Sequence, residues 1–265
     1  MKKGLCLVGF LVLAAQLPLS GYDSSPSGLQ VVPEAIWAAA TGGGTWVTEI
    51  QITNYHATPA DVQVYFDYNG GAVGPIMLYA GLAQFRSIRY PNILAAIDSL
   101  DAGATVYFGK VGALMFYSPG RLLQVQAKTV NGNYGKTFPG LPPVTGNTAA
   151  ENRPMIIQDL VQNATYRTSV GAYNAGSISI TVTFTILDAA DVTIGSSFTR
   201  TLGGYGFLSF NPFTQAGVPS GTYENCWLYI NVTSGGVQDN GLMCYGSIAN
   251  NLTNDTYALI AKMYD

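Results

Sequence analysis

Charged side chains are scarce in this 265-residue chain, in which 12 Lys and Arg and 15 Asp and Glu make up 10 % of the residues. An ordinary soluble domain has about 25 %. The few basic residues are scattered, so the chain lacks the positive stripe that neutralises nucleic-acid phosphates. Hydrophobic residues make up 48 %, which excludes disordered chains of low hydrophobicity and high charge. We therefore expect a folded protein that binds no nucleic acid.

Residues that carry catalysis or hold metal ions are also scarce. His56 is the only histidine, it lies in a polar turn, and no G-x-S-x-G nucleophile motif accompanies it. One His and few Cys cannot supply the clustered ligands of a zinc site. Two acid pairs, Asp98 with Asp101 and Asp188 with Asp191, occupy turn-like settings where aspartates bind local backbone; a Ca²⁺ site or a hydrolytic pair is the alternative there. The sequence predicts no enzyme activity, no metal and no cofactor.

Residues 1–21 have the layout of a secretory signal peptide. Lys2 and Lys3 precede a twelve-residue apolar stretch, Gly4 to Ala15, which small and polar residues follow. The stretch is short for a membrane anchor, and a buried N-terminal helix is the alternative. Cys6 leaves with the signal, and no later apolar run is long enough to span a membrane. We therefore expect a mature chain without a membrane span, secreted to the medium, the periplasm or the cell surface.

Apolar and polar residues alternate with a period of two along much of the chain. The pattern is clearest at 62–68, 123–129 and 178–186, and it predicts strands that bury one face and expose the other. Burial of one face favours antiparallel sheets. Only Asn92 to Leu100 has a helical pattern. The sequence therefore predicts an all-β fold.

The chain also repeats itself. A shift of 120 residues places 46–66 on 166–186, so that Thr48 meets Thr168 and Asn54 meets Asn174. We expect two tandem antiparallel β-sandwiches, immunoglobulin-like or jelly-roll-like, that arose by internal duplication; one large barrel is the alternative. The predicted division is a signal peptide (1–21), an N-terminal extension (22–30), a first sandwich (31–138), a Pro-rich linker (139–154) and a second sandwich (155–265).

Two cysteines remain after export, Cys226 and Cys244. Each shares a strand face with apolar residues, and the two predicted strands follow one another in the sequence. An even pair in an exported protein favours a disulfide. Two buried free thiols that pack as small apolar side chains are the alternative.

Aromatic residues occupy the nominally polar faces of some strands, and these are Tyr65, Trp227, Tyr229 and Tyr245. Flat rings that face outward can pack against the apolar face of a sugar, so these four residues form a candidate binding platform. Exposed aromatic residues also mark contacts between proteins or domains, which is the alternative interpretation.

Three segments resemble a motif of certain secreted bacterial proteins. The motif has a Gly-rich turn, the pattern W-R-T-x-V and an Asn-Pro-Gly-like turn, and two segments are similar to it: VVPEAIW…GGGTWVTEIQITN (31–54) and TYRTSVGAYNAGS (165–177). A third segment resembles the end of such a repeat: NYGKTFPGLP (133–142). This family has tandem immunoglobulin-like β-sandwich repeats and no established activity, so the resemblance implies a fold and no catalytic residue. The sequence departs from the pattern at Val47, where Arg is usual.

These observations predict a secreted, non-catalytic structural or cell-surface protein that self-assembles or adheres, with itself or another surface protein as partner. Strand addition through Gly28 to Ile36 is one route to assembly, although pairing within its own domain is favoured. The alternative function is a carbohydrate-binding module that holds a polysaccharide on the four aromatic residues. A glycan hydrolase ranks last.

Overall fold

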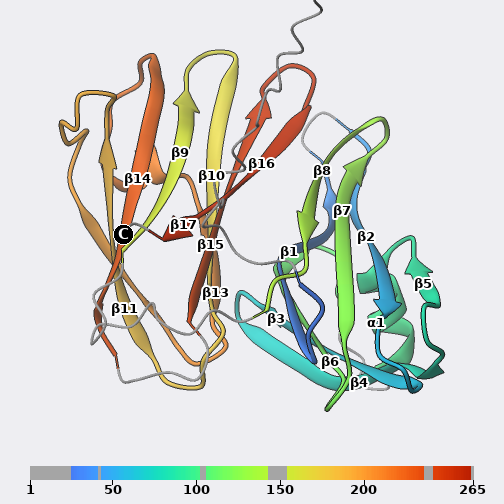
Figure 1. The fold of residues 1–265 in the computed structure, drawn as a ribbon. Helices are drawn as coiled ribbons and strands as arrows, with labels where there is room; N and C mark the ends of the chain where they lie inside the picture. Colours follow the sequence, from blue (N-terminus) through green and yellow to red (C-terminus); the bar gives the residue numbers. More distant parts are fainter. Residues whose placement is uncertain (1–24, 41–42, 102–105, 143–153, 236–240, 264–265) are drawn as a thin grey trace, which may run out of the picture.

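The computed structural model describes residues 25–40, 43–101, 106–142, 154–235 and 241–263. Of these residues, 62 % are in strands and 6 % in helices. The sheets are antiparallel, and Figure 1 shows how they are arranged. The predicted all-β fold class is therefore confirmed. The predicted signal peptide, residues 1–21, and most of the predicted linker lie outside the described residues. No helix in the described ranges is long and apolar enough to cross a membrane.

The first half of the chain forms one curled sheet with two layers (Figure 1). The strand order is β4-β3-β6-β1-β2-β7-β8, and β5 pairs with β2. The elements are β1 (Leu29–Ala39), β2 (Thr45–Asn54), β3 (Ala60–Tyr68), β4 (Gly71–Leu82), β5 (Ser87–Tyr90), α1 (Ile93–Leu100), β6 (Lys110–Tyr117), β7 (Leu123–Asn131) and β8 (Tyr134–Pro139).

The second half forms two sheets, of order β12-β11-β14-β9-β17 and β13-β10-β15-β16. Its elements are β9 (Met155–Gln162), β10 (Tyr166–Asn174), β11 (Ile180–Leu187), β12 (Phe198–Leu202), β13 (Phe207–Phe210), α2 (Pro212–Gln215), β14 (Tyr223–Ser234), β15 (Leu242–Asn250), β16 (Thr256–Ile260) and β17 (Lys262–Met263).

The two halves share one scheme of strand pairing. Six strand pairs of the first half each have a counterpart in the second: β3–β4 corresponds to β11–β12, β3–β6 to β11–β14, β1–β6 to β9–β14, β2–β5 to β10–β13, β2–β7 to β10–β15, and β7–β8 to β15–β16. Each half also places its helix directly after the strand that pairs with β2 or β10. The duplication itself, as the origin of this match, remains a prediction.

The first strand of each half accounts for the main difference between them. β1 has eleven residues, and its register shifts between Val32 and Ala35, where the chain passes through Pro33. Beyond that shift β1 reaches β2 as well as β6, so it joins the two layers into one sheet. β9 has eight residues and pairs with β14 and β17, so its layer stays separate from the other one.

A buried asparagine closes the same turn in each half. The Asn54 side chain donates to the Thr58 and Leu82 carbonyls at 2.9 and 2.8 Å and accepts from the His56 amide. The Asn174 side chain donates to the Ile178 and Gly203 carbonyls, both at 2.8 Å, and accepts from the Gly176 amide. Buried amides of this kind satisfy backbone groups that the turn leaves without a sheet partner.

The short helices begin with the same kind of cap. Asn92 precedes α1, and its side chain accepts a hydrogen bond from the Ala95 amide at 3.1 Å. Asn211 precedes α2 and accepts from the Thr214 amide at 3.1 Å. Such caps satisfy an amide that has no partner inside the helix. The helix predicted over 92–100 is confirmed, and α2 is a four-residue helix that the sequence pattern did not indicate.

The alternating pattern places one core in each half. β3, β7 and β11 bury every second side chain, as predicted for 62–68, 123–129 and 180–186. The inward position predicted for Ile178 is wrong, because β11 begins at Ile180 and Ile178 is 50 % exposed. Phe66 and Phe116 lie in the first core, and Phe184 lies in the second, where it stacks on Phe198 at 5.3 Å. Burial of a large apolar side chain of this kind contributes about 1.5–3 kcal/mol.

Strand β15, in the four-stranded sheet of the second half, is buried on both of its faces. One face of β15, with Leu242 and Cys244, lies in the second core. The other face, with Met243 and Tyr245, lies in the core cluster of the first half, together with Tyr173 from β10. The two halves therefore share an apolar interface. The start of the predicted linker belongs to the first half, because Leu141 forms a β-bridge with Val31.

Candidate functional site

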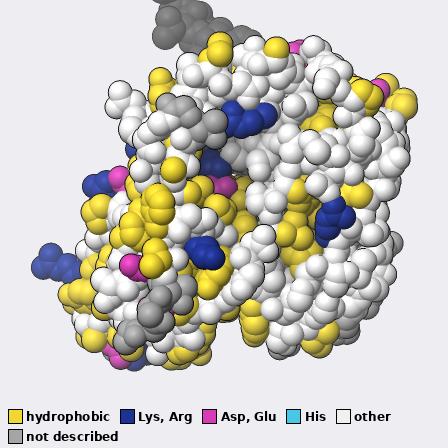
Figure 2. Space-filling view, turned by 180° about the vertical axis from the view of Figure 1, so that it is seen from behind, with side chains coloured by type: hydrophobic (Ala, Val, Ile, Leu, Met, Phe, Trp, Pro, Cys, Tyr) yellow, Lys and Arg dark blue, Asp and Glu magenta, His cyan; other side chains and the backbone are white. Residues whose placement is uncertain are grey.

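A cleft with a volume of about 750 Å³ lies between the two halves. Figure 2 shows the surface hollowed along the line where the halves meet, with hydrophobic side chains on it and few charged ones. Strands β1, β3, β4 and β6 of the first half and the β12–β13 turn of the second half supply its walls. The lining residues are Leu29, Tyr65, Asp67, Tyr68, Gly70, Gly71, Ala72, Val73, Gly74, Met115, Tyr117, Gly204, Tyr205, Gly206 and Phe207.

Aromatic rings from both halves line this cleft. Tyr65 lies opposite Met115 in the β3–β6 ladder, so these two side chains share a sheet face. Tyr117 ends β6 and is 37 % exposed, and Tyr205 in the β12–β13 turn is 42 % exposed. Phe207 is nearly buried at the start of β13. The cleft therefore presents ring surface on two sides.

Glycines let the backbone approach these rings. A Cβ on Gly74 would lie 2.7 Å from the Val64 carbonyl oxygen and 3.0 Å from the Tyr65 ring, and Gly74 has a φ of +125°. A side chain at this position would therefore displace either β3 or the Tyr65 ring. The Gly-rich turn between β3 and β4 keeps one wall of the cleft thin and lines it with backbone groups.

Asp67 is the charged residue of the cleft. It is only 4 % exposed, and the Tyr173 hydroxyl of the second half donates a hydrogen bond of 2.6 Å to its Oδ2 atom. Burial raises the pKa of Asp67 from 3.8 to about 6, because a low-dielectric surrounding disfavours the charged form, and the Tyr173 hydrogen bond opposes part of this shift. Burial and the charge of Asp67 together raise the pKa of Tyr173.

The lining chemistry suits binding. Tyrosine rings offer flat apolar faces, and one carboxylate offers an acceptor inside a partly desolvated space. Glycosidases need two carboxyl groups at a defined separation, and the lining residues of the cleft include Asp67 as their single acid.

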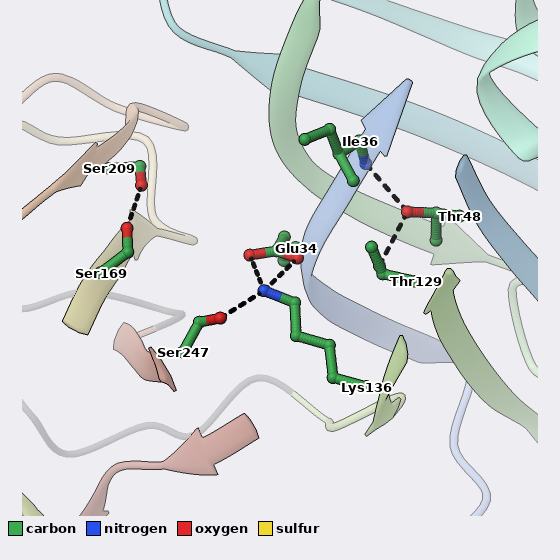
Figure 3. Close-up of polar contacts among 8 residues, drawn as sticks. All are labelled: Glu34, Ile36, Thr48, Thr129, Lys136, Ser169, Ser209 and Ser247. Atoms are coloured by element: carbon green, nitrogen blue, oxygen red, sulfur yellow. Dashed lines mark hydrogen bonds and ion pairs between the residues drawn. The ribbon is translucent and has the colours of Figure 1, made fainter. Parts of the chain in front are cut away.

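A second polar cluster lies at the same interface, away from the cleft (Figure 3). The Lys136 ammonium of β8 pairs with the Glu34 carboxylate of β1 at 2.7 Å, and each side chain is 8 % exposed. Lys136 also donates to the Ser247 hydroxyl of β15 at 2.8 Å. Two buried charges are tolerated because each has the other as partner and further hydrogen bonds satisfy the ammonium.

This cluster has the composition of a Ser-Lys dyad, but its geometry is that of a structural contact. Lys136 donates its protons to Glu34 and Ser247, so the ammonium has no lone pair with which to activate the serine. Beside it, the Thr48 hydroxyl accepts from the Ile36 amide at 2.9 Å and contacts the Thr129 hydroxyl at 3.0 Å. The cluster therefore fixes β8 and β1 against β15 and holds the two halves in register.

The predicted aromatic platform does not form as one surface. Tyr245 is 1 % exposed and lies between the halves, where its ring packs against Phe138 at 5.3 Å, so its assignment to an outward platform is wrong. The face that the sequence pattern treats as polar is covered here by the other half of the chain. This outcome matches the alternative interpretation of the aromatic residues as a contact between domains.

The other three platform residues lie on two separate surfaces. Trp227 and Tyr229 are half-buried on the outer face of β14, and the Trp227 indole N–H donates to the Asp188 carbonyl at 3.1 Å. Tyr65 lies in the cleft, on the first half. The sheet that carries β14 faces away from the first half (Figure 1).

The predicted disulfide between Cys226 and Cys244 is not formed, and both thiols are buried and free. Cys226 lies on β14, which pairs with β11 and β9, whereas Cys244 lies on β15, which pairs with β10 and β16. The two strands belong to different sheets rather than to one hairpin, so the thiols enter the core from opposite layers. Burial raises the pKa of both thiols.

The remaining candidate residues make local contacts. His56 is in an exposed turn, where its Nδ1 lies 3.0 Å from the Thr58 hydroxyl. Asp98 accepts from the Tyr107 amide, Asp101 accepts from the Tyr107 hydroxyl, and Asp188 accepts from the Ala190 and Val192 amides around Asp191. In the described part of the chain, no group of three or more His, Cys, Asp or Glu side chains is placed to hold a metal ion.

Sequence reasoning did not single out Asp67, Tyr68, Tyr117 or Tyr205. One signal for Asp67 was present, because it follows Tyr65 by two residues and so shares its strand face. An acid on a strand face with an aromatic neighbour is unusual where the rest of the chain is poor in charge. The contribution of Tyr205 had no such signal, since it depends on how the halves pack.

The fold and the cleft define an all-β protein with a ligand-sized, aromatic space between two similar halves. A scan against models of known protein families finds no match, and a search of curated proteins finds no relative.

Proposed function

We propose that this protein is an exported, non-catalytic binding protein of the cell surface and that its ligand lies in the cleft between the halves. One observation carries the proposal: rings from both halves converge on a 750 Å³ space that contains a buried carboxylate. A space of this size suits a small ligand or a few units of a polymer. Export rests on the signal-like layout of residues 1–21.

A saccharide is the ligand class that this lining supports best. Pyranose rings have apolar faces that pack on tyrosine, and hydroxyl groups that donate to a carboxylate or bind backbone groups. The cleft offers the rings of Tyr65, Tyr117 and Tyr205, the Asp67 carboxylate and the backbone of two Gly-rich turns. Attachment of the protein to a glycan would also make it adhesive.

The test is retention of the purified protein on a panel of insoluble polysaccharides. We expect Tyr65→Ala and Tyr205→Ala to lose most of the retention, since each removes one wall of the cleft. Trp227→Ala is the matched control, because it removes an aromatic residue from the outer face of β14 and should leave retention unchanged. Loss with Trp227→Ala alone would move the site to that outer face, and absence of retention on every glycan would overturn the proposal.

Self-assembly is a second candidate, and the edge strand β4 supports it. β4 has twelve residues and ends the eight-stranded sheet, and it exposes 45 % of Met77 and 42 % of Tyr79. Such an edge can pair with another copy of the chain. The segment considered for strand addition, Gly28 to Ile36, pairs within its own half, with β6 along one edge and through the Val31–Leu141 bridge on the other, so β4 is the better candidate.

Light scattering across a concentration series tests this candidate. If copies pair through β4, the mass should rise with concentration, and Met77→Lys should suppress that rise. Thr199→Lys places the same charge on β12, the edge strand of the second half, and should have a smaller effect. A monomer at every concentration would contradict assembly through β4.

A further inference from the structure

The charge of Asp67 has no counter-ion in the described chain. The ion pairs there join Arg89 to Glu49 and Lys136 to Glu34. The Tyr173 hydroxyl is the one described side chain that donates to the Asp67 carboxylate, and it uses Oδ2. Among the described side chains, the other carboxylate oxygen, Oδ1, has no donor, and Asp67 is one of the residues that line the cleft.

The cleft is poor in positive charge of its own. No Lys or Arg is among its described lining residues. Lys110 is the basic side chain next to it, and its Nζ atom stands 5.1 Å from the centre of the Tyr68 ring without forming an ion pair with Asp67. The Tyr68 ring packs against Phe66 and Tyr107 of the first core, so this cation contact lies on the opposite face of β3 from Tyr65 and Asp67.

We propose that the saccharide bound in the cleft is an amino sugar, with its protonated amino group against Asp67 and between the tyrosine rings. This inference rests on the proposed function, because it specifies the ligand of the same cleft. A cation supplies the missing counter-charge in a space from which water is largely excluded, where a charge pair is stronger than in water. The faces of Tyr65, Tyr117 and Tyr205 favour a cation further through their ring quadrupoles.

Neutral and acidic saccharides fit this site less well. A neutral ring would cover the carboxylate without compensating its charge, and the cost of desolvation would rise. An acidic sugar would add a second negative charge beside the first. Among these three classes of saccharide, the amino sugar combines an apolar ring face with a single positive charge, which one carboxylate neutralises.

The pH dependence of binding follows from the groups that face Asp67. Tyr173 faces it from β10, and the tyrosines at positions 65, 117 and 205 line the cleft from β3, β6 and the β12–β13 turn. Lys110 lies beside Tyr68, whose ring packs against Phe66 on the other face of β3. Burial raises the pKa of Asp67 to about 6. Protonation of Asp67 removes the negative charge of the pair, so between pH 7 and pH 5 the binding of an amino sugar that stays protonated over this range should weaken.

The experiment compares two ligands that share a ring and differ in charge. Calorimetric titration at pH 7 with a β-1,4-linked glucosamine tetramer should give an affinity at least about tenfold higher than with the N-acetylated tetramer. Asp67→Asn keeps the shape and the acceptor for Tyr173 and should abolish that preference. Asp61→Asn, which changes an exposed acid on the same strand, should preserve it. Circular dichroism checks that each variant folds.

Each result separates the inference from the function on which it rests. Tighter or equal binding of the N-acetylated tetramer to the unchanged protein would overturn the amino-sugar assignment and support the binding function. Loss of both interactions in Tyr205→Ala would support the cleft as the site. If neither tetramer nor any glycan of the panel binds, the proposed function and the inference are both wrong.

Discussion

The outer faces of β3 and β11 occupy matching positions in the two halves, yet they carry different residues. β3 presents Tyr65 and Asp67 on this face, and the second half covers it in part. β11 presents Thr183 and Thr185 on the matching face, and both are half-exposed. The inward residues of the two strands are apolar in both cases. The fold thus depends on the inward positions, and the outward positions determine which surface meets the other half.

A second pair of matching strands, β2–β7 and β10–β15, also carries different residues on the outer face in the two halves. In the β2–β7 ladder, Gln51 lies opposite Gln126, and both are exposed. In the matching β10–β15 ladder, Gly171 lies opposite Tyr245, whose ring is buried between the halves. A Cβ on Gly171 would lie 1.9 Å from the Tyr245 ring, so the glycine provides the space for the ring.

This contrast predicts the largest stability effect. Gly171→Ala should displace the Tyr245 ring from its place against Phe138 and lower the free energy of unfolding by about 3 kcal/mol. The matched change Gln51→Ala should alter it by less than about 0.5 kcal/mol, because that side chain is exposed. Urea denaturation measures both values. Equal effects at the two positions would contradict the described interface.

The two turn asparagines should behave alike. Asn54→Ala and Asn174→Ala each remove the side-chain partner of two carbonyls and one amide in the turn, which should cost about 2 kcal/mol in either half. Denaturation of the two single variants tests this equality. A cost confined to one half would show that the turns are not equivalent in energy.

Asp67 should give the first half a pH dependence that the second half lacks, since Leu187 occupies the matching position. The folded protein binds a proton at Asp67 more tightly than the unfolded chain, because the pKa is about 6 instead of 3.8. The stabilising contribution of this proton is present below pH 3.8 and is lost as the pH rises through 6. Relative to Asp67→Asn, the protein should lose about 2 kcal/mol of stability from pH 4 to pH 7. Denaturation of both proteins at the two pH values measures the difference, and parallel curves would contradict the burial of this carboxyl.

The thiols should give the smallest effect. Because Cys226 and Cys244 are free, a reducing agent should leave the melting temperature unchanged. Alkylation of the unfolded, unreduced protein followed by mass spectrometry should find both thiols modified. If both cysteines resist alkylation until a reducing agent is added, they form the disulfide that the sequence predicts, and the described free thiols are wrong.

Much of the fold could be predicted from the sequence because it depends on local pattern. Alternation at 62–68, 123–129 and 178–186 identified β3, β7 and β11, and the helical pattern at 92–100 identified α1. The alignment of Asn54 with Asn174 indicated two turns that the structure builds with the same hydrogen bonds. These features need only the side chains of one strand or one turn.

The site could not be predicted in the same way, because it depends on contacts between the halves. Tyr245 has the alternation of an outward residue, and nothing local shows that another half of the chain covers it. Cys226 and Cys244 have inward positions on successive strands, yet those strands enter different sheets. The cleft joins Tyr65 and Asp67 to Tyr205, which lies 138 positions after Asp67 in the sequence and approaches it only through packing.

The carboxyl ¹³C signal of Asp67, followed against pH by NMR, tests most directly whether the two halves enclose a binding cleft around this residue. We predict a titration midpoint near pH 6 in the free protein. Saturation with the glucosamine tetramer should shift that midpoint downward, because a cation favours the carboxylate. An ordinary midpoint near pH 4 that the tetramer leaves unchanged would contradict both the burial of Asp67 and its place in the site.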